Sequence, residues 1–164
     1  MTRDRPAADG ADLAHVLEAH RRYLGSERRE GARADLRGVD LSRMSLVAAD
    51  LRRARLAHAR LDGADCDRAN LHGANLAGAS LRGARLRQAD LSKARLSGAQ
   101  LAAADLTGAR LEQVDMEFAL LVEAKLSGAS LCDADLSGAN VAAADLSDAD
   151  LRRANLRGAD LRDA

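Results

Sequence analysis

The sequence predicts an all-β solenoid built from short, regularly spaced corners, and three observations carry this prediction. Two apolar positions recur every five residues from residue 34 to residue 164 without a slip in register. Glycine recurs two residues after the larger of these apolar positions. The chain has one Phe, one Tyr and no Trp, and its apolar side chains are mostly Ala and Leu. These features favour a narrow core over a wide globular one, which aromatic residues normally fill.

The larger apolar position is a leucine that recurs from Leu36 to Leu161, and an alanine stands two residues before it, from Ala34 to Ala164. The exceptions are Cys66, Met116 and Val141 at the leucine position, and Val39, Met44 and Val114 at the alanine position. On an α-helix a step of five residues rotates by about 500°, so the leucines would spiral around every face. Along a continuous strand they would alternate between faces. A chain that turns a corner every five residues buries both positions, because residues two apart share one side.

The remaining positions of each unit point outward and support the corner. Glycine often fills the last position, as at Gly73, Gly78 and Gly83, and it suits a turn that needs unusual backbone angles. The charges set the size of the ring, because four units per coil would stack residues twenty apart at about 4.8 Å. The charges alternate along the series Asp65, Arg85, Asp105, Lys125 and Asp145, and two further opposite pairs are Asp67 with Arg87 and Asp90 with Arg110. The sequence therefore predicts four units per coil.

The unit resembles that of the pentapeptide-repeat family, A-[DN]-L-x-x. Matching segments are ADLRR (49–53), ANLHG (69–73), ANLAG (74–78) and ADLSG (134–138), and the likeness spans residues 34–164. The resemblance implies a right-handed quadrilateral β-helix. At the spacing of paired strands, about six and a half coils would stand roughly 30 Å tall.

The N-terminal part follows a different pattern. Residues 1–10 are polar and we expect them to be flexible. Residues 11–33 predict a capping helix and loop, in which Asp12 caps the start and Gly25 ends the helix. The apolar positions of this helix are Leu13, Val16, Leu17 and Leu24. The segment is similar to a leader found ahead of the repeats in some bacterial family members, and we expect it to cover the open end of the β-helix, with His20 packed under the first coil.

Residue chemistry argues against an enzyme. His15 and His20 lie five apart on the expected helix, about 140° from each other, so they cannot share one metal ion. His58 and His72 fall on different sides of the predicted rod. The carboxylates follow the repeat on a convex surface, where no cleft would shift the pKa of a catalytic pair. We therefore expect no catalytic residues, no metal and no cofactor; Cys66 is expected to act as a small core residue.

The chain has no membrane-length apolar run and no signal peptide, which predicts a cytoplasmic protein without membrane association. Its total formal charge is zero, but the charge is unevenly distributed. Residues 52–110 hold eleven Lys and Arg side chains against five Asp, whereas residues 111–150 hold nine Asp and Glu against one Lys. This acidic band (111–150) follows a basic section (52–110), an asymmetry that could orient a partner.

One segment, VDMEFALLVEA (114–124), departs from the repeat. Its inward positions remain apolar, so the core register survives, but Phe118, Leu120 and Val122 fall at outward positions. Four units per coil would place small side chains one coil on either side of Val122; these are Ala102, Ala103, Ala142 and Ala143. We expect these seven residues to form an apolar patch. Because contiguous exposed apolar surface usually marks an interface, we expect this patch to bind a partner. The alternative is a local irregularity in which Phe118 folds over a corner.

These features favour a non-enzymatic rod that binds a protein through the apolar patch. Its partner is not identified by the sequence, and self-association through the patch or through the uncapped C-terminal end is a further expectation. The resemblance implies an alternative: some family members mimic DNA and bind gyrase, which protects it from drugs or toxins. Direct nucleic-acid binding is not expected, because Asp is interleaved with Arg and aromatic residues for stacking are lacking.

Overall fold

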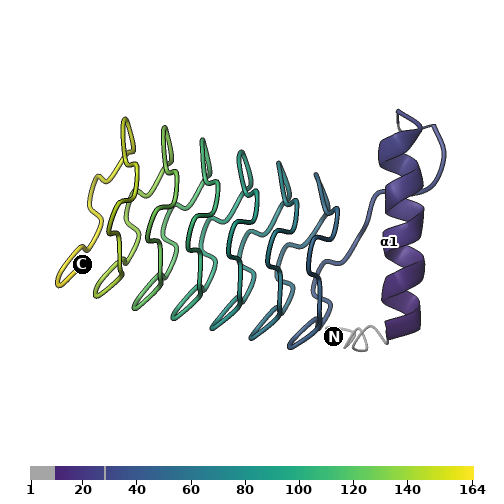
Figure 1. The fold of residues 1–164 in the computed structure, drawn as a ribbon, viewed down its shortest axis with the longest axis horizontal. Coiled ribbons are helices and arrows are strands. Elements are labelled where there is room, and N and C mark those ends of the chain that lie inside the picture. The colour runs from purple at the N-terminus through teal and green to yellow at the C-terminus, as the bar shows by residue number, and fades with distance from the viewer. Residues whose placement is uncertain (1–9, 28) are drawn as a thin grey trace, which may run out of the picture.

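The computed structural model describes residues 10–27 and 29–164. From residue 34 onward the chain forms a stack of four-sided coils, and helix α1 (Gly10–Gly25) lies across one end of the stack (Figure 1). In these described residues the coils pair through single-residue parallel bridges rather than through extended strands. Residues 1–10 were expected to be flexible; residues 1–9 fall outside the described part of the chain, and Gly10 instead begins α1.

Each bridge joins residues twenty apart, from Asp35 with Arg55 to Asn140 with Asp160. The backbone of the leucine position locks this register: the N–H of Leu51, for example, donates to the carbonyl of Asn70 at 2.8 Å. Because the unit is five residues long, a register of twenty gives four sides per coil. This confirms the ring size that the charge pattern predicted.

All the corners share one turn geometry. The carbonyl of the leucine position accepts a hydrogen bond from the N–H three residues later, as from Ala54 to Leu51 at 2.9 Å. The residue before that N–H has a positive φ at every corner, from 53° at Ala48 to 71° at Gly158. This is the signature of a type II turn, which favours glycine at its third position. Glycine fills only some of these positions, so many other residues adopt a backbone that costs a side chain about 1 kcal/mol.

The core is a column of leucine and alanine side chains. The inward residues of the middle coils are fully buried, and the exceptions Cys66, Val114 and Met116 are buried with them. Burial raises the pKa of the Cys66 thiol to about 12, so it packs as an inert apolar group. Toward the last coil the column becomes accessible: Leu151 and Leu156 are half-buried, and Leu161 is 39% exposed.

Helix α1 covers the first coil through one face. Leu13 is buried, and Val16 and Leu17 pack beside it against the core. The helix ends at Gly25, as predicted, but it begins at Gly10. Asp12 therefore lies in the first turn rather than at the capping position, where its charge still favours the helix dipole.

The loop after the helix is held by Gly31, whose φ is +75°. A Cβ atom there would collide with the carbonyl oxygen of Ala19 and lie 2.8 Å from the nitrogen of Tyr23. The next residue, Ala32, donates its N–H to the same Ala19 carbonyl at 3.2 Å. Glycine at position 31 thus lets the chain return along the helix into the first coil.

His20 joins the helix to the first coil with both ring nitrogens. Its Nδ1 accepts the N–H of Ala34 at 3.1 Å, so its Nε2 carries the proton and donates to the carbonyl of Arg52 at 3.1 Å. The side chain is completely buried, and this burial lowers its pKa. His20 is therefore a packing residue under the first coil, as predicted, and it also satisfies two backbone groups at the end of the stack.

The series of alternating charges from Asp65 to Asp145 stacks in the predicted register, but its members do not all form ion pairs with their neighbours. Arg85 contacts Asp65 at 3.3 Å and Asp67 at 2.8 Å, and Arg87 also binds Asp67. Because Arg85 turns toward these two carboxylates, it forms no ion pair with Asp105 on its other side, within the part of the chain that the structure describes. The pair of Arg110 with Asp90 forms at 3.6 Å.

Candidate functional site

The predicted apolar patch lies along one side of a single coil and its two neighbours. Leu120 stands in the middle of this side, bridged to Gln100 in one adjacent coil and Asn140 in the other. It is 44% exposed, which makes it the most exposed leucine among the residues that the structure describes. Bridge partners Gln100 and Asn140 were not part of the predicted patch, although the twenty-residue register could have identified them.

Val122 lies at the next corner, where the alanines surround it as predicted. Its carbonyl accepts the N–H of Ala103 at 2.9 Å, and the carbonyl of Ala142 accepts the N–H of Glu123 at 3.1 Å. Val122, Ala102 and Ala142 are half-buried, whereas Ala103 and Ala143 are exposed. The structure therefore brings Leu120, Val122 and the four alanines to one surface.

Phe118 lies at the preceding corner, with a φ of +55°. Its ring leans toward the next coil and lies over Gly138, where an added Cβ would come within 2.5 Å of the ring atom Cε1. The alternative in which Phe118 folds over a corner therefore describes the position of the ring. Packing on Gly138 leaves Phe118 68% exposed, so it does not bury the ring. Phe118 forms one edge of the patch, with Gly138 as its floor.

The surface around the patch is short of charge over three coils. We call this surface the apolar face; it consists of the outward residues from position 97 to position 103 and of those one and two coils further on. These residues are Ser97, Gly98, Gln100, Ala102, Ala103, Glu117, Phe118, Leu120, Val122, Glu123, Ser137, Gly138, Asn140, Ala142 and Ala143. Two glutamates are its only charges. Depletion of charge is characteristic of the core of a protein–protein interface.

Groups that could support catalysis or metal binding are dispersed. His15 is exposed on α1, and His58 rests over Gly78, with its Nδ1 2.6 Å from where a Cβ would stand. Cys132 is half-buried, and its Sγ lies 3.9 Å from Nη2 of Arg152. Across the residues that the structure describes, no three His, Cys, Asp or Glu side chains gather as metal ligands, and no helix is long and apolar enough to cross a membrane.

Comparison with known families supports the five-residue repeat that the sequence shows. Residues 32–65, 49–88, 64–101, 99–138 and 134–164 match the family described as pentapeptide repeats. The chain belongs to the pentapeptide-repeat family. Membership implies that the four-sided stack is a right-handed quadrilateral β-helix, as the resemblance of the repeat unit led us to expect.

Several solved pentapeptide-repeat structures are similar to this chain. One, from the thylakoid lumen of Arabidopsis thaliana, is 33% identical over 62% of this chain and 67% of its own, with a TM-score of 0.47. HetL from Nostoc sp., involved in heterocyst differentiation regulation, is 29% identical over 87% of this chain and 91% of its own, with a TM-score of 0.26. QnrB1, a plasmid-mediated fluoroquinolone resistance protein, is 19% identical over 77% of this chain and 78% of its own, with a TM-score of 0.45. No curated protein matches the chain. At these TM-scores the likenesses carry no functional argument.

Proposed function

We propose that this pentapeptide-repeat protein is a non-enzymatic interaction rod that binds another protein chain through its apolar face. The observation that carries the proposal is the exposure of Phe118 and Leu120, at 68% and 44%, on a surface with two charges in three coils. Large exposed apolar side chains surrounded by small uncharged ones form the kind of surface that a partner buries.

The rod supports binding by holding this face rigid. The backbone on both sides of Leu120 is fully bonded, because its N–H donates to Ala99 at 2.9 Å and its carbonyl accepts from Leu101 at 2.7 Å. A surface that is ordered before binding loses little conformational entropy when a partner docks. In this proposal α1 acts as the cap of the first coil, and about six and a half coils give a platform roughly 30 Å long.

Substitution of the two aliphatic residues tests the site. The double variant Leu120→Asp, Val122→Asp adds two charges to the apolar face, and we expect it to weaken partner binding by at least about tenfold. The matched control is Val47→Asp, because Val47 is also an outward aliphatic residue, 40% exposed, but on the first coil. Sedimentation velocity of the wild type and both variants would measure self-association through this face.

The partner itself can be captured by placing a photo-crosslinking amino acid at position 120 in cells, with position 47 as the control. Circular dichroism would show that each variant keeps the fold. If the double variant binds the captured partner as tightly as the wild type does, and self-associates as the wild type does, the apolar face is not the binding site.

The acidic band favours a second candidate, binding to gyrase in place of DNA. Residues 111–150 carry nine acidic side chains and one lysine, but two of the three coils of the apolar face lie within this band and a basic section precedes it. A negative surface that imitates a duplex would need to extend further. Gyrase supercoiling with excess protein, measured with and without a gyrase poison, tests it: an unchanged rate in both conditions would rule out this candidate.

Self-association through the C-terminal end remains a separate prediction. Leu161 is 39% exposed and the neighbouring core leucines are half-buried, so a second copy could cover this apolar surface. In sedimentation velocity, Leu161→Asp would abolish a dimer formed through this end and leave one formed through the apolar face intact.

A further inference from the structure

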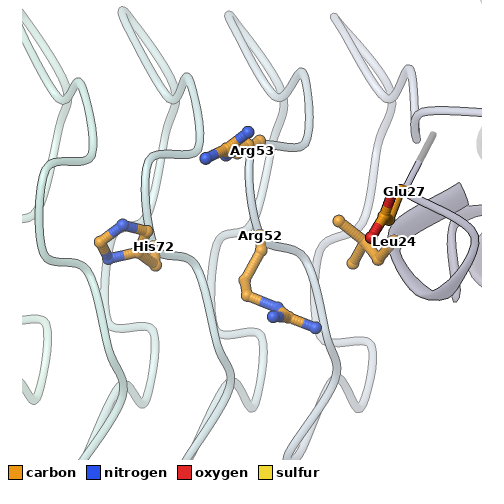
Figure 2. Close-up of a pocket in the computed structure, with 5 residues that line it drawn as sticks. All are labelled: Leu24, Glu27, Arg52, Arg53 and His72. Atoms are coloured by element: carbon orange, nitrogen blue, oxygen red, sulfur yellow. The ribbon is translucent and has the colours of Figure 1, made fainter.

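A concave, positively charged groove lies where the loop after α1 meets one corner of the first coils. It consists of two adjoining cavities of about 420 and 380 Å³, which share Arg53 and His72. Leu24, Glu27 and Arg52 complete the first cavity, and Tyr23, Arg33, Gly73 and Lys93 complete the second. Figure 2 shows Arg53 and His72 on adjacent coils, with Leu24 and Glu27 opposite them on the α1 side.

The centre of the groove is a notch above a glycine. Arg53, Gly73 and Lys93 occupy the same corner position in three successive coils, as the twenty-residue register requires. At about 4.8 Å per coil, Arg53 and Lys93 emerge roughly 10 Å apart. Gly73 has no side chain, and the stem of Arg53 leans over it: among the described residues, an added Cβ at Gly73 would contact Cγ of Arg53 at 3.6 Å. The notch therefore has backbone as its floor, the Arg53 side chain reaching over it from one coil, and Lys93 in the coil on its other side.

The cations of the notch lack carboxylate partners. In the described part of the chain, no Asp or Glu oxygen lies within 4.0 Å of a charged nitrogen of Arg33, Arg53 or Lys93. Arg33 donates to the backbone carbonyl of Arg53, which holds its guanidinium beside the notch. The fourth cation differs: Arg52 binds the Asp50 carboxylate at 2.6 Å.

Among the described residues that line the two cavities, Glu27 is the one carboxylate. The groove therefore has a net positive charge. Concave surfaces lined by one sign of charge raise the local concentration of ligands of the opposite sign.

We propose that this notch binds a diphosphate group, with Arg53 and Lys93 contacting it from either side. Arginine and lysine are the usual ligands of phosphoryl oxygens, and two separated cations suit two linked phosphoryl groups better than one carboxylate. Tyr23 and Leu24 form an apolar wall at the α1 side of the groove, which suits a base attached to the diphosphate. The site is independent of the apolar face.

Calorimetric titration at low ionic strength tests the proposal, with inorganic pyrophosphate and ADP as the probes. Arg53→Gln and Lys93→Gln should each weaken pyrophosphate binding by roughly tenfold, because each removes one charge-assisted contact. Gly73→Asn fills the notch without a change of charge and tolerates a positive φ, so it should weaken binding at least as much. Arg157→Gln, which removes an exposed arginine from another corner, is the matched control and should change binding by less than twofold.

The two probes distinguish the source of the diphosphate. If ADP binds more tightly than pyrophosphate and Tyr23→Leu removes this advantage, the ligand is a nucleotide; equal binding points to a diphosphate without a base. Binding of pyrophosphate that Arg53→Gln and Gly73→Asn leave within twofold of the wild type would overturn the proposal. So would a short DNA duplex that binds more tightly than pyrophosphate and depends on the same residues.

Discussion

Asp67 provides the sharpest test of pairing between coils. It is 9% exposed, its carboxylate accepts the backbone N–H of Arg87 at 3.1 Å, and the side chains of Arg85 and Arg87 both donate to it. The hydrogen bond from Arg87 is the main cause that lowers its pKa, from 3.8 to about 2. A shift of this size corresponds to about 2 kcal/mol of stability. Because both arginines are half exposed and screened by water, we expect Asp67→Asn to cost about 1–2 kcal/mol at neutral pH.

Urea denaturation followed by circular dichroism measures this loss. The pH dependence follows from the lowered pKa: the stability from Asp67 is fully present above its unfolded pKa near 3.8 and is lost as the pH falls through about 2. The gap between wild type and Asp67→Asn should therefore narrow as the pH falls from about 4 toward 2. Asp133→Asn, at an exposed pair with Arg153, is the control and should cost less. Equal stability of the wild type and Asp67→Asn at neutral pH, or a difference in stability that does not narrow in acid, would show that the Asp67 ion pairs do not stabilise the stack.

Three further predictions concern the cap, the corners and the core. His20→Phe leaves the N–H of Ala34 and a carbonyl of the first coil unpaired, so it should cost about 1–3 kcal/mol and speed amide exchange at Ala34. Because burial lowers the pKa of His20, the wild type should lose its contribution as the pH falls below the unfolded value of 6.5, and the variant should not show this loss. Ala48→Gly relieves a φ of +53° and should raise the free energy of unfolding by about 1 kcal/mol, whereas Ala57→Gly, at a corner position without positive φ, should lower it. Leu96→Ala, at a fully buried position, should cost about 2–5 kcal/mol in urea denaturation.

The residue pattern predicted the repeat, the register and the inward side chains because each depends on spacing alone. Two apolar positions in phase define which side chains are buried, and charges twenty apart identify the coil length before any contact is known. The end of α1 at Gly25 and the packing role of His20 also followed from local patterns. These features are set by backbone geometry and burial, which a periodic sequence specifies strongly.

Side-chain direction could not be predicted in the same way. Register places Phe118 between two glycines, but the choice of Gly138 depends on which way the ring turns at a positive-φ corner. Arg85 can reach carboxylates on either side, and it binds Asp65 and Asp67. The corners without glycine gave no sequence signal for a type II turn, because the cost at each is small compared with the backbone bonds and core burial that hold the stack together.

Photo-crosslinking at position 120 is the decisive test of whether the protein binds a partner through its apolar face, because Leu120 stands at the middle of that face. We expect a probe at position 120 to join the protein to one defined partner chain and a probe at position 47 not to do so. We also expect the Val122→Asp substitution to reduce the yield at position 120. Equal yields to the same partner from positions 120 and 47, or a yield at position 120 that Val122→Asp leaves unchanged, would contradict the claim that this face is the binding surface.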